Sequence, residues 1–285
     1  MLALLIWYQN LKSNQTLNNM NNTNSKLKWK PLFLLLVITA TSFSCGNQNN
    51  RSAEGDKSDG AVEANHYKTL LIIGDDRSGS TSDIRKLTAE EYQMLFESVA
   101  KNGGGAVAVC LIGNPLPQSR EPFILPLASL ENPIPYNPKD TRLTLSQKKV
   151  IRKKNAAIAE NNQQKLNQNK TAIGDFLAKE INPKVVEYRP SGKDYTDIND
   201  ALRRINILCN EPQYRDYDKI VVALLSDGKN QPRDNRVEPI VEQLNNTRIQ
   251  LLLVGWNQPT ECFKDIKPEI LSSKNGIFEI INNQN

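Results

Sequence analysis

The chain contains a single histidine, His66, and its four cysteines form no Cys-x-x-Cys pair. A zinc site built from several histidines is therefore excluded, and a Ser-His-Asp or Cys-His catalytic centre would depend on a residue that lies just before the first expected strand. Aromatic residues make up only 6% of the chain. The formal charge of +5, from 36 basic and 31 acidic residues, is too small to indicate nucleic-acid binding by itself.

What the sequence does contain is enough apolar material for a substantial core. Hydrophobic residues account for 39% of the 285 positions, which suits one large α/β domain or two small ones. Three consecutive glycines at 103–105 lie between an expected helix and an expected strand, the reverse of the order in a dinucleotide-binding loop. They are interpreted as a turn.

The N-terminal region has the layout of an export signal. Lysines between positions 26 and 30 precede an apolar run from Leu32 to Phe43, and small residues follow. The run is too short to span a bilayer comfortably, and this order of charge, apolar run and small residues is typical of a secretory signal peptide. Met20 is a better start than Met1 for such a signal.

The end of this signal resembles a bacterial lipobox. Ser44 is small and Cys45 follows it as the residue that would carry lipid, although Ser42 stands where leucine is usual. Cleavage by an ordinary signal peptidase also fits the two serines. We favour the lipoprotein, because the Asn- and Ser-rich residues 46–65 would form a flexible tether. The sequence thus predicts a signal over 1–45, a tether, and a folded domain over 66–285 in the bacterial cell envelope.

Apolar runs and helical patterns alternate through the folded part. Strands are expected at 69–73, 106–112, 220–225, 248–254 and 277–281, and helices at 88–102, 197–208, 236–246 and 262–273. Strands that are apolar on both faces and alternate with helices indicate a parallel sheet covered on both sides. The fold class predicted is a doubly wound α/β domain with a mostly parallel sheet.

Residues 114–184 interrupt this alternation as a long insertion. Six prolines over 114–136 predict an irregular loop, and 146–182 is predicted to be one long helix with a narrow apolar stripe. Between Lys148 and Lys184 there are nine basic residues and three acidic ones. This helix is either a contact arm for an acidic partner or an anionic membrane surface, or a solvated helix that lies on the domain.

Five oxygen-bearing residues fall where loops of such a sheet meet. Asp76, Ser78 and Ser80 follow the first strand, Thr196 opens a helix, and Asp227 follows the third strand. Loops at the carboxyl ends of parallel strands share one crevice. Carboxylate and hydroxyl oxygens suit a hard cation, Mg²⁺ first, with Mn²⁺ or Ca²⁺ as alternatives. The set leaves a coordination position that an acidic group of a partner would fill.

These motifs resemble the metal-ion-dependent adhesion site of von Willebrand factor A domains. The matching parts are D-R-S-G-S at 76–80, the threonine at 196 and S-D-G at 226–228, and the resemblance spans about 66–282. It implies a sheet of about six strands with one antiparallel edge strand. It also implies that no reaction is catalysed and that a protein ligand is bound.

The resemblance further implies a role for each ligand. Ser78 and Ser80 would coordinate the metal directly, Thr196 directly or in one state only, and Asp76 and Asp227 mostly through water. If Thr196 merely caps the following helix, a role that Asp197 can also fill, the site loses a ligand. Asp75 is a rival to its neighbour, but only counting from Asp76 places serines at the second and fourth following positions.

Two features depart from the family pattern. Arg77 stands where small or apolar residues are usual, and it would either steer an acidic ligand toward the metal or point to solvent. The insertion at 114–184 is longer than usual, and it would cover or extend the binding face.

Two other functions remain open. One is a Mg²⁺-dependent phosphohydrolase or phosphotransferase, since paired aspartates at strand ends also hold metal in such enzymes. The other is a scaffold that binds through the basic helix at 146–182. Of the cysteines, Cys110 is expected to be buried in a strand, and a disulfide between Cys209 and Cys262 is left open because their separation is unknown.

Overall fold

The computed structural model describes residues 65–78, 85–113, 121–189, 195–232, 236–263 and 265–283. These residues belong to one compact unit, which runs from Asp59 to Asn285. The predicted signal, Cys45 and most of the predicted tether lie outside the described residues, and so does Ser80. Among the helices that are described, none is both long and apolar enough to cross a bilayer.

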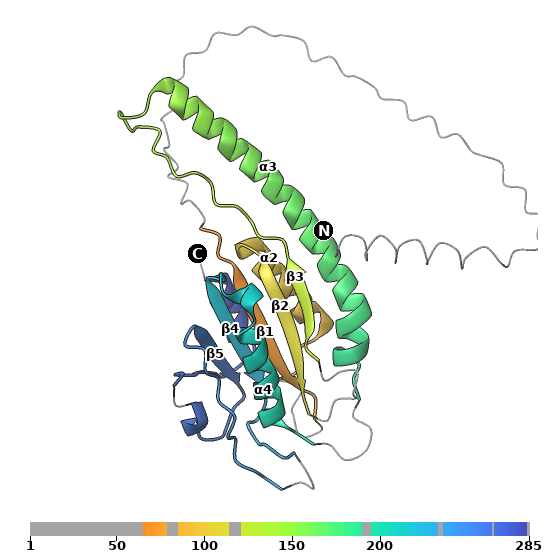
Figure 1. The fold of residues 1–285 in the computed structure, drawn as a ribbon. Helices are drawn as coiled ribbons and strands as arrows, with labels where there is room; N and C mark the ends of the chain where they lie inside the picture. Colours follow the sequence, from red (N-terminus) through yellow and green to blue (C-terminus); the bar gives the residue numbers. More distant parts are fainter. Residues whose placement is uncertain are drawn as a thin grey trace, which may run out of the picture. The chain divides into compact units, whose positions relative to one another are not determined.

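The centre of the unit is a six-stranded sheet with the order β3-β2-β1-β4-β5-β6. Strand β3 pairs antiparallel with β2, and all other neighbours are parallel. The strands are β1 (Thr69–Asp76), β2 (Gly105–Ile112), β3 (Phe123–Leu127), β4 (Lys219–Leu225), β5 (Ile249–Val254) and β6 (Glu269–Leu271). The predicted α/β class with a mostly parallel sheet is therefore confirmed, with one antiparallel strand at an edge (Figure 1).

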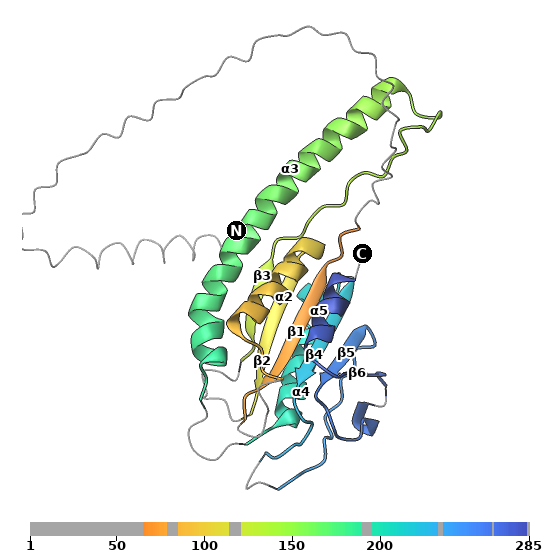
Figure 2. The same cartoon turned by 180° about the vertical axis from the view of Figure 1, so that it is seen from behind.

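Helices cover both faces of the sheet. They are α2 (Ala89–Asn102), α3 (Leu145–Phe176), the π-helix η2 (Leu177–Val186), α4 (Ile198–Cys209) and α5 (Asn275–Asn282), with short 3-10 turns η3 (Pro212–Tyr214) and η4 (Glu261–Phe263). Alternate residues of β1 point to opposite faces. Leu71 and Ile73 join one buried cluster with α2, η2 and α5, while Leu70 and Ile72 join a second one with α4. Figures 1 and 2 show α4 on one side of the sheet and α2 with α5 on the other.

The predicted helix start at Thr88 is confirmed by its hydrogen bonds. The Thr88 hydroxyl accepts a bond from the Glu91 N–H, and the Glu91 carboxylate accepts one from the Thr88 N–H at 2.8 Å. Such a reciprocal pair satisfies two of the N–H groups that a helix start leaves open. The helix ends where the chain turns at Gly103, as the sequence indicated.

The predicted strand at 277–281 is wrong, because these residues form α5. Ile277 and Ile281 lie one helical turn apart and are both buried in the cluster that includes α2. The Asn102 side chain donates to the Ile281 carbonyl at 2.6 Å and fixes the helix end. A five-residue apolar run is compatible with either structure, and residues four positions apart share a face in both, so the sequence pattern alone does not distinguish them.

Two predicted helices are also wrong. The segment 262–273 contains only the end of η4 and then β6, which extends the sheet beside β5. Residues 237–246 have no helical structure. Backbone N–H groups of Val241 and Glu242 donate to the side chain of Asn199, so α4 supplies the hydrogen bonds that a helix would have made internally.

The insertion contains more structure than the sequence predicted. The proline-rich part includes β3, which occupies a sheet edge where Pro126 is tolerated. The long basic helix is confirmed as α3 and its continuation η2. Pro183 within η2 has no N–H to donate, which favours a widened helix there.

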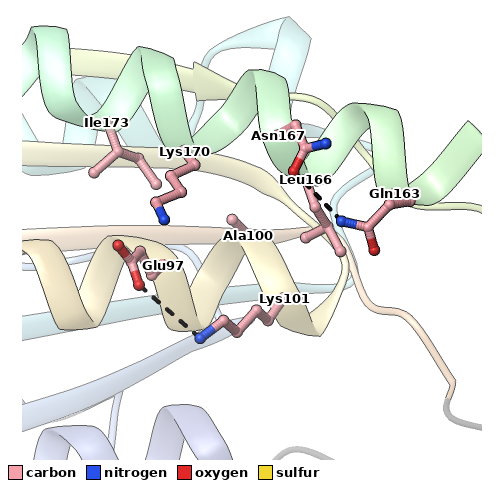
Figure 3. Close-up of a pocket in the computed structure, with 8 residues that line it drawn as sticks. All are labelled: Glu97, Ala100, Lys101, Gln163, Leu166, Asn167, Lys170 and Ile173. Carbon is pink, nitrogen blue, oxygen red and sulfur yellow. Dashed lines mark hydrogen bonds and ion pairs between the residues drawn. The ribbon is translucent and has the colours of Figure 1, made fainter. Parts of the chain in front are cut away.

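One half of α3 lies against α2 and the other half extends beyond it. A cavity of about 190 Å³ marks the crossing, and Figure 3 shows Leu166 and Ile173 of α3 facing the α2 side with Ala100 opposite them. The remaining lining residues are Glu97, Lys101, Gln163, Asn167 and Lys170. Residues of α3 before Gln163 have no part in this crossing.

Candidate metal centre

Asp76 is the last residue of β1 and is fully buried. Its Oδ1 accepts a hydrogen bond from the Ser78 N–H at 2.9 Å, and its Oδ2 accepts one from the Ser226 hydroxyl at 2.8 Å. The strand alternation turns Asp76 to the same face as Ile72, which is the face that α4 covers. Two bonds from two different loops therefore fix the orientation of this carboxylate.

Asp227 lies in the loop that follows β4, next to the serine that contacts Asp76. Its Oδ1 accepts a bond from the Lys229 N–H at 3.0 Å, and the Lys229 ammonium lies 3.8 Å from Oδ2. Gly228 has a φ of 81° and its Cα faces the Trp256 ring so closely that a Cβ would lie 2.7 Å from it. Only glycine fits this turn, which brings Asp227 to the end of the sheet.

Thr196 is tied to the same loop through its backbone. Its N–H donates to the Gln231 carbonyl at 3.1 Å, and its carbonyl accepts from the Gln231 N–H at 2.7 Å. The Thr196 side chain is buried, with 3% exposed. The loop that carries Asp227 and the segment that opens α4 are thus joined directly.

The N-cap of α4 is Asp197, and Thr196 does not fill this role. Asp197 Oδ1 accepts the Asp200 N–H at 2.9 Å, and Asn230 Oδ1 accepts the Ile198 N–H at 3.0 Å. These two side chains satisfy the first N–H groups of the helix. Within the described residues the Thr196 hydroxyl makes no hydrogen bond, so it is available to a ligand.

The structure thus brings Asp76, Ser78, Thr196 and Asp227 to one end of the sheet, and the fifth predicted ligand, Ser80, lies outside the described residues. In the described part of the chain, no three His, Cys, Asp or Glu side chains are grouped so that they could hold a metal. A metal here would rely on hydroxyl oxygens as well as carboxylates. Such a neutral and anionic oxygen set suits Mg²⁺, which keeps part of its water shell.

Asp75 and Arg77 lie on the opposite face of β1 from Asp76. The Arg77 guanidinium donates to Asp75 Oδ2 at 2.6 Å and to the Leu87 carbonyl at 2.7 Å, and the Tyr92 hydroxyl donates to the same carboxylate oxygen. Asp75 is fully buried and Arg77 is 7% exposed. Both expectations for Arg77 are therefore wrong: it neither points to solvent nor reaches toward a ligand.

The reason for this pairing is electrostatic. A buried carboxylate is costly unless a cation and hydrogen bonds compensate it, and Arg77 supplies both. Burial works against the charged guanidinium, yet the Asp75 charge holds the pKa of Arg77 above its ordinary value. Burial and the Asp75 charge raise the pKa of Tyr92. Asp75 Oδ2 is thus occupied on the α2 side, while its Oδ1 has no hydrogen-bond partner within the described residues, and of the two neighbouring aspartates only Asp76 faces the candidate site.

Three residues of the site were not singled out from the sequence. Ser226 orients Asp76, Asn230 bonds to the start of α4, and Gln231 pairs with Thr196. Ser226 belongs to the S-D-G motif and could have been assigned a role from it. Asn230 and Gln231 carry no such signal, since their contacts appear only when the loop folds back on residues 196–198.

The three cysteines in the described part of the chain, Cys110, Cys209 and Cys262, are free thiols. Cys110 is buried in β2 as expected, and burial raises its pKa to about 12. Cys209 is buried at the end of α4 with a pKa also raised to about 12, and Cys262 is half-buried in η4. The disulfide that the sequence left open between Cys209 and Cys262 is not formed.

No model of a known protein family matches this chain, and no curated protein matches it either. The resemblance to von Willebrand factor A domains therefore stays a prediction from the sequence motifs.

Proposed function

We propose that this protein binds a divalent metal, Mg²⁺ in the first instance, and uses it to hold an acidic group of a protein partner. The observation that carries the proposal is the Thr196 hydroxyl. Thr196 is a buried residue paired with the Asp227 loop, its hydroxyl has no hydrogen bond within the described residues, and the capping role that would explain it belongs to Asp197.

The other residues have complementary tasks in this proposal. Asp76 and Asp227 supply negative charge, Ser78 and Thr196 supply neutral oxygens, and Ser226 keeps Asp76 turned toward the site. Ser80, two residues beyond Ser78, would complete the set. When bound, the metal would act as a positive centre for a carboxylate, and the protein would contribute no acid or base to a reaction.

Lys229 has a place in the same proposal. Its ammonium lies 3.8 Å from Asp227 Oδ2 and is about half exposed. A metal bound to Asp227 would repel this ammonium, which can swing outward on its flexible stem. There it would face an incoming acidic ligand and strengthen its attraction to the site.

The metal is tested by calorimetric titration of Mg²⁺ and Mn²⁺ into residues 59–285, the unit that contains both buried clusters. We expect saturable binding that is lost in Asp76→Ala and weakened in Thr196→Val. Binding that is equal in all three proteins would place the metal elsewhere. Partner capture is then compared with and without a chelator, and capture that persists in chelator would refute the metal-bridged contact.

The export proposal is tested separately. We propose that the chain is a lipid-anchored protein of the cell envelope that carries its lipid on Cys45. Growth of a bacterial expression host with labelled palmitate should label the intact chain and not Cys45→Ser. Equal labelling of the two, or release of both as unmodified protein, would refute the lipid anchor without affecting the metal site.

A further inference from the structure

Helix α3 continues well past the sheet. Figures 1 and 2 both show its first half beyond the end of the sheet where β1 begins, which is the end opposite to the candidate metal centre. From Leu145 to Asn162 the helix has 18 residues, or about 27 Å at 1.5 Å per residue. An extended segment, residues 128–138, runs back along it. We call this segment the strap, and the strap with 145–162 the arm.

The strap is held by side-chain amides at every seventh position of α3. Each asparagine accepts a hydrogen bond from one strap N–H and donates one to the carbonyl of the same residue, at 2.7–3.0 Å. The pairs are Asn169 with Ala128, Asn162 with Glu131 and Asn155 with Ile134. Seven helical residues rise about 10.5 Å, close to the length of three extended residues, so the two repeats stay in register.

The arm is therefore held together by polar contacts that need no apolar partner. Further contacts continue the pattern toward the tip, where Lys148 donates to the Pro138 carbonyl and Arg152 to the Tyr136 hydroxyl, both at 2.7 Å. A projection built in this way is stable in water with its other face uncovered. That face is free to contact something outside the domain.

The uncovered face is basic. Six basic residues lie between positions 141 and 159; Lys148 and Arg152 contact the strap, Arg142 pairs with Asp140, and the other three are left for the uncovered face. Lys149, Lys153 and Lys154 lie on the side of the helix away from Asn155, at 100° per residue. Within the described residues the side chains of these three lysines have neither an ion-pair partner nor a hydrogen bond. Leu145 and Val150 add apolar surface, being 86% and 51% exposed.

The foot of the arm is also where the polypeptide enters the domain. The His66 N–H donates to the side chain of Asn132 in the strap at 2.6 Å, just before β1 begins. Residues 46–65, the predicted tether, precede this point. A flexible chain of twenty residues spans about 25 Å on average, close to the length of the arm. A lipid on Cys45 would thus hold the arm tip within reach of the bilayer surface.

We propose that the arm tip is a docking surface for anionic lipid headgroups. Lysines attract an anionic surface, and Leu145 and Val150 would enter its outermost layer. Charge and exposure suit any acidic partner, and the chain entry at the foot of the arm, with a predicted tether about as long as the arm, favours a membrane over an acidic protein. The inference goes beyond the proposed function, because it involves the opposite end of the domain and needs no metal.

The test is co-sedimentation of residues 59–285 with vesicles, in low salt and with a chelator present. Phosphatidylcholine vesicles are compared with vesicles that also contain phosphatidylglycerol. The test variant is Lys149→Glu/Lys153→Glu/Lys154→Glu. The matched control reverses three exposed lysines outside the arm, Lys170→Glu/Lys179→Glu/Lys267→Glu, and has the same net charge. Circular dichroism establishes that both variants are folded.

We expect the wild type and the control variant to bind the anionic vesicles only, and salt to weaken this binding. Reversal of the three arm lysines should lower the partition coefficient at least a hundredfold, since each lysine at such a surface contributes about a factor of five or more. Equal loss in both variants would show that net charge alone is responsible and would overturn the proposal. Absence of binding by the wild type would also overturn it, and would leave an acidic protein as the partner of the arm.

Discussion

The Ser226 hydroxyl donates to Asp76 Oδ2 at 2.8 Å, and so joins two residues that lie 150 positions apart. Ser226 also accepts a bond from the Gly228 N–H at 3.2 Å, so one hydroxyl links the end of β1 to the turn that carries Asp227. The relative position of the two carboxylates depends on this serine. It acts by positioning, and no direct contact with a metal is required of it.

Removal of this hydroxyl should weaken the metal site while the fold is retained. We expect Ser226→Ala to lower Mg²⁺ affinity about 10- to 100-fold, the usual effect of losing a group that orients a ligand. Calorimetric titration measures it, with Ser98→Ala on α2 as a control that also loses one hydroxyl bond. An unchanged affinity in Ser226→Ala would mean that Asp76 is oriented by other contacts.

Thr196 and Asp197 should separate metal binding from helix capping. Thr196→Val keeps the shape and the backbone pairing with Gln231, so we expect weaker metal binding and a change in unfolding free energy under about 1 kcal/mol. Asp197→Ala should cost about 1 kcal/mol of stability through the lost cap and should retain metal binding. The opposite pattern, measured by titration and urea unfolding, would reverse the two roles.

The buried residues Asp75 and Arg77 should affect the stability of the fold as an ion pair, so that loss of the cation alone is more harmful than loss of both charges. Arg77→Met leaves the Asp75 carboxylate buried without its cation, and we expect a loss of about 3–5 kcal/mol in the free energy of unfolding. Asp75→Asn/Arg77→Met removes both charges and should recover a large part of this loss. Urea unfolding of the three proteins measures it. A double variant as unstable as Arg77→Met would show that the charge is not the cause.

The hydrogen bonds between the asparagines of α3 and the strap should contribute less to stability with increasing distance from the sheet. Asn169 is 3% exposed, so Asn169→Ala leaves the Ala128 backbone groups unpaired in a buried place and should cost about 2–3 kcal/mol. Asn155 is only half-buried, so water can replace part of the bonds that Asn155→Ala loses, and the cost should be smaller, about 1 kcal/mol. Faster hydrogen exchange of the Ile134 amide in Asn155→Ala would report the local loosening. An equal loss of unfolding free energy in Asn169→Ala and Asn155→Ala would contradict this expected decrease along the arm.

The buried thiols should make the protein sensitive to alkaline pH. Burial raises the pKa of Cys110 and of Cys209 from 9.0 to about 12, so the folded state keeps protons that the unfolded chain releases above pH 9. The stabilisation is complete below pH 9 and is lost as the pH rises toward about 12, by about 1 kcal/mol per thiol for each pH unit. Urea unfolding at several pH values measures how steeply the free energy of unfolding falls as the pH rises above 9. The fall should be less steep in Cys110→Ala/Cys209→Ala than in Cys262→Ala. An equally steep fall in both variants would contradict the assignment of this pH dependence to Cys110 and Cys209.

The sheet was predictable because its strands are apolar on both faces and are bounded by turns. Strand β2 and helix α4 lie within a residue or two of their expected bounds. The C-terminal third was predicted less well. At 237–246 the outcome depended on Asn199, a residue about forty positions away, whose side chain accepts backbone N–H groups. Local pattern contains no information on such a contact.

The candidate site, like the fold, was predictable from the sequence only in part. The order of Asp76, Thr196 and Asp227 and their places at element ends were visible in the sequence, because motif and strand pattern coincide there. The position of the Arg77 side chain was not predicted, because it depends on which face of β1 each neighbouring residue occupies. Alternation past the expected strand end at Ile73 would have placed Asp75 and Arg77 together, had β1 been predicted to continue to Asp76.

The asparagine pairs of the arm contact only backbone atoms of the strap, and this has a consequence for how the two segments tolerate substitution. The asparagine pairs themselves set no requirement on the strap side chains, except that proline, which has no N–H, cannot stand at the anchored positions 128, 131 and 134. The three prolines of the strap, Pro133, Pro135 and Pro138, indeed lie between or beyond these positions. The asparagines themselves are far less replaceable, since aspartate lacks the donor and glutamine is one carbon too long. At positions 128 and 134 the strap should therefore accept many side chains, whereas the asparagines that anchor it should not be replaceable.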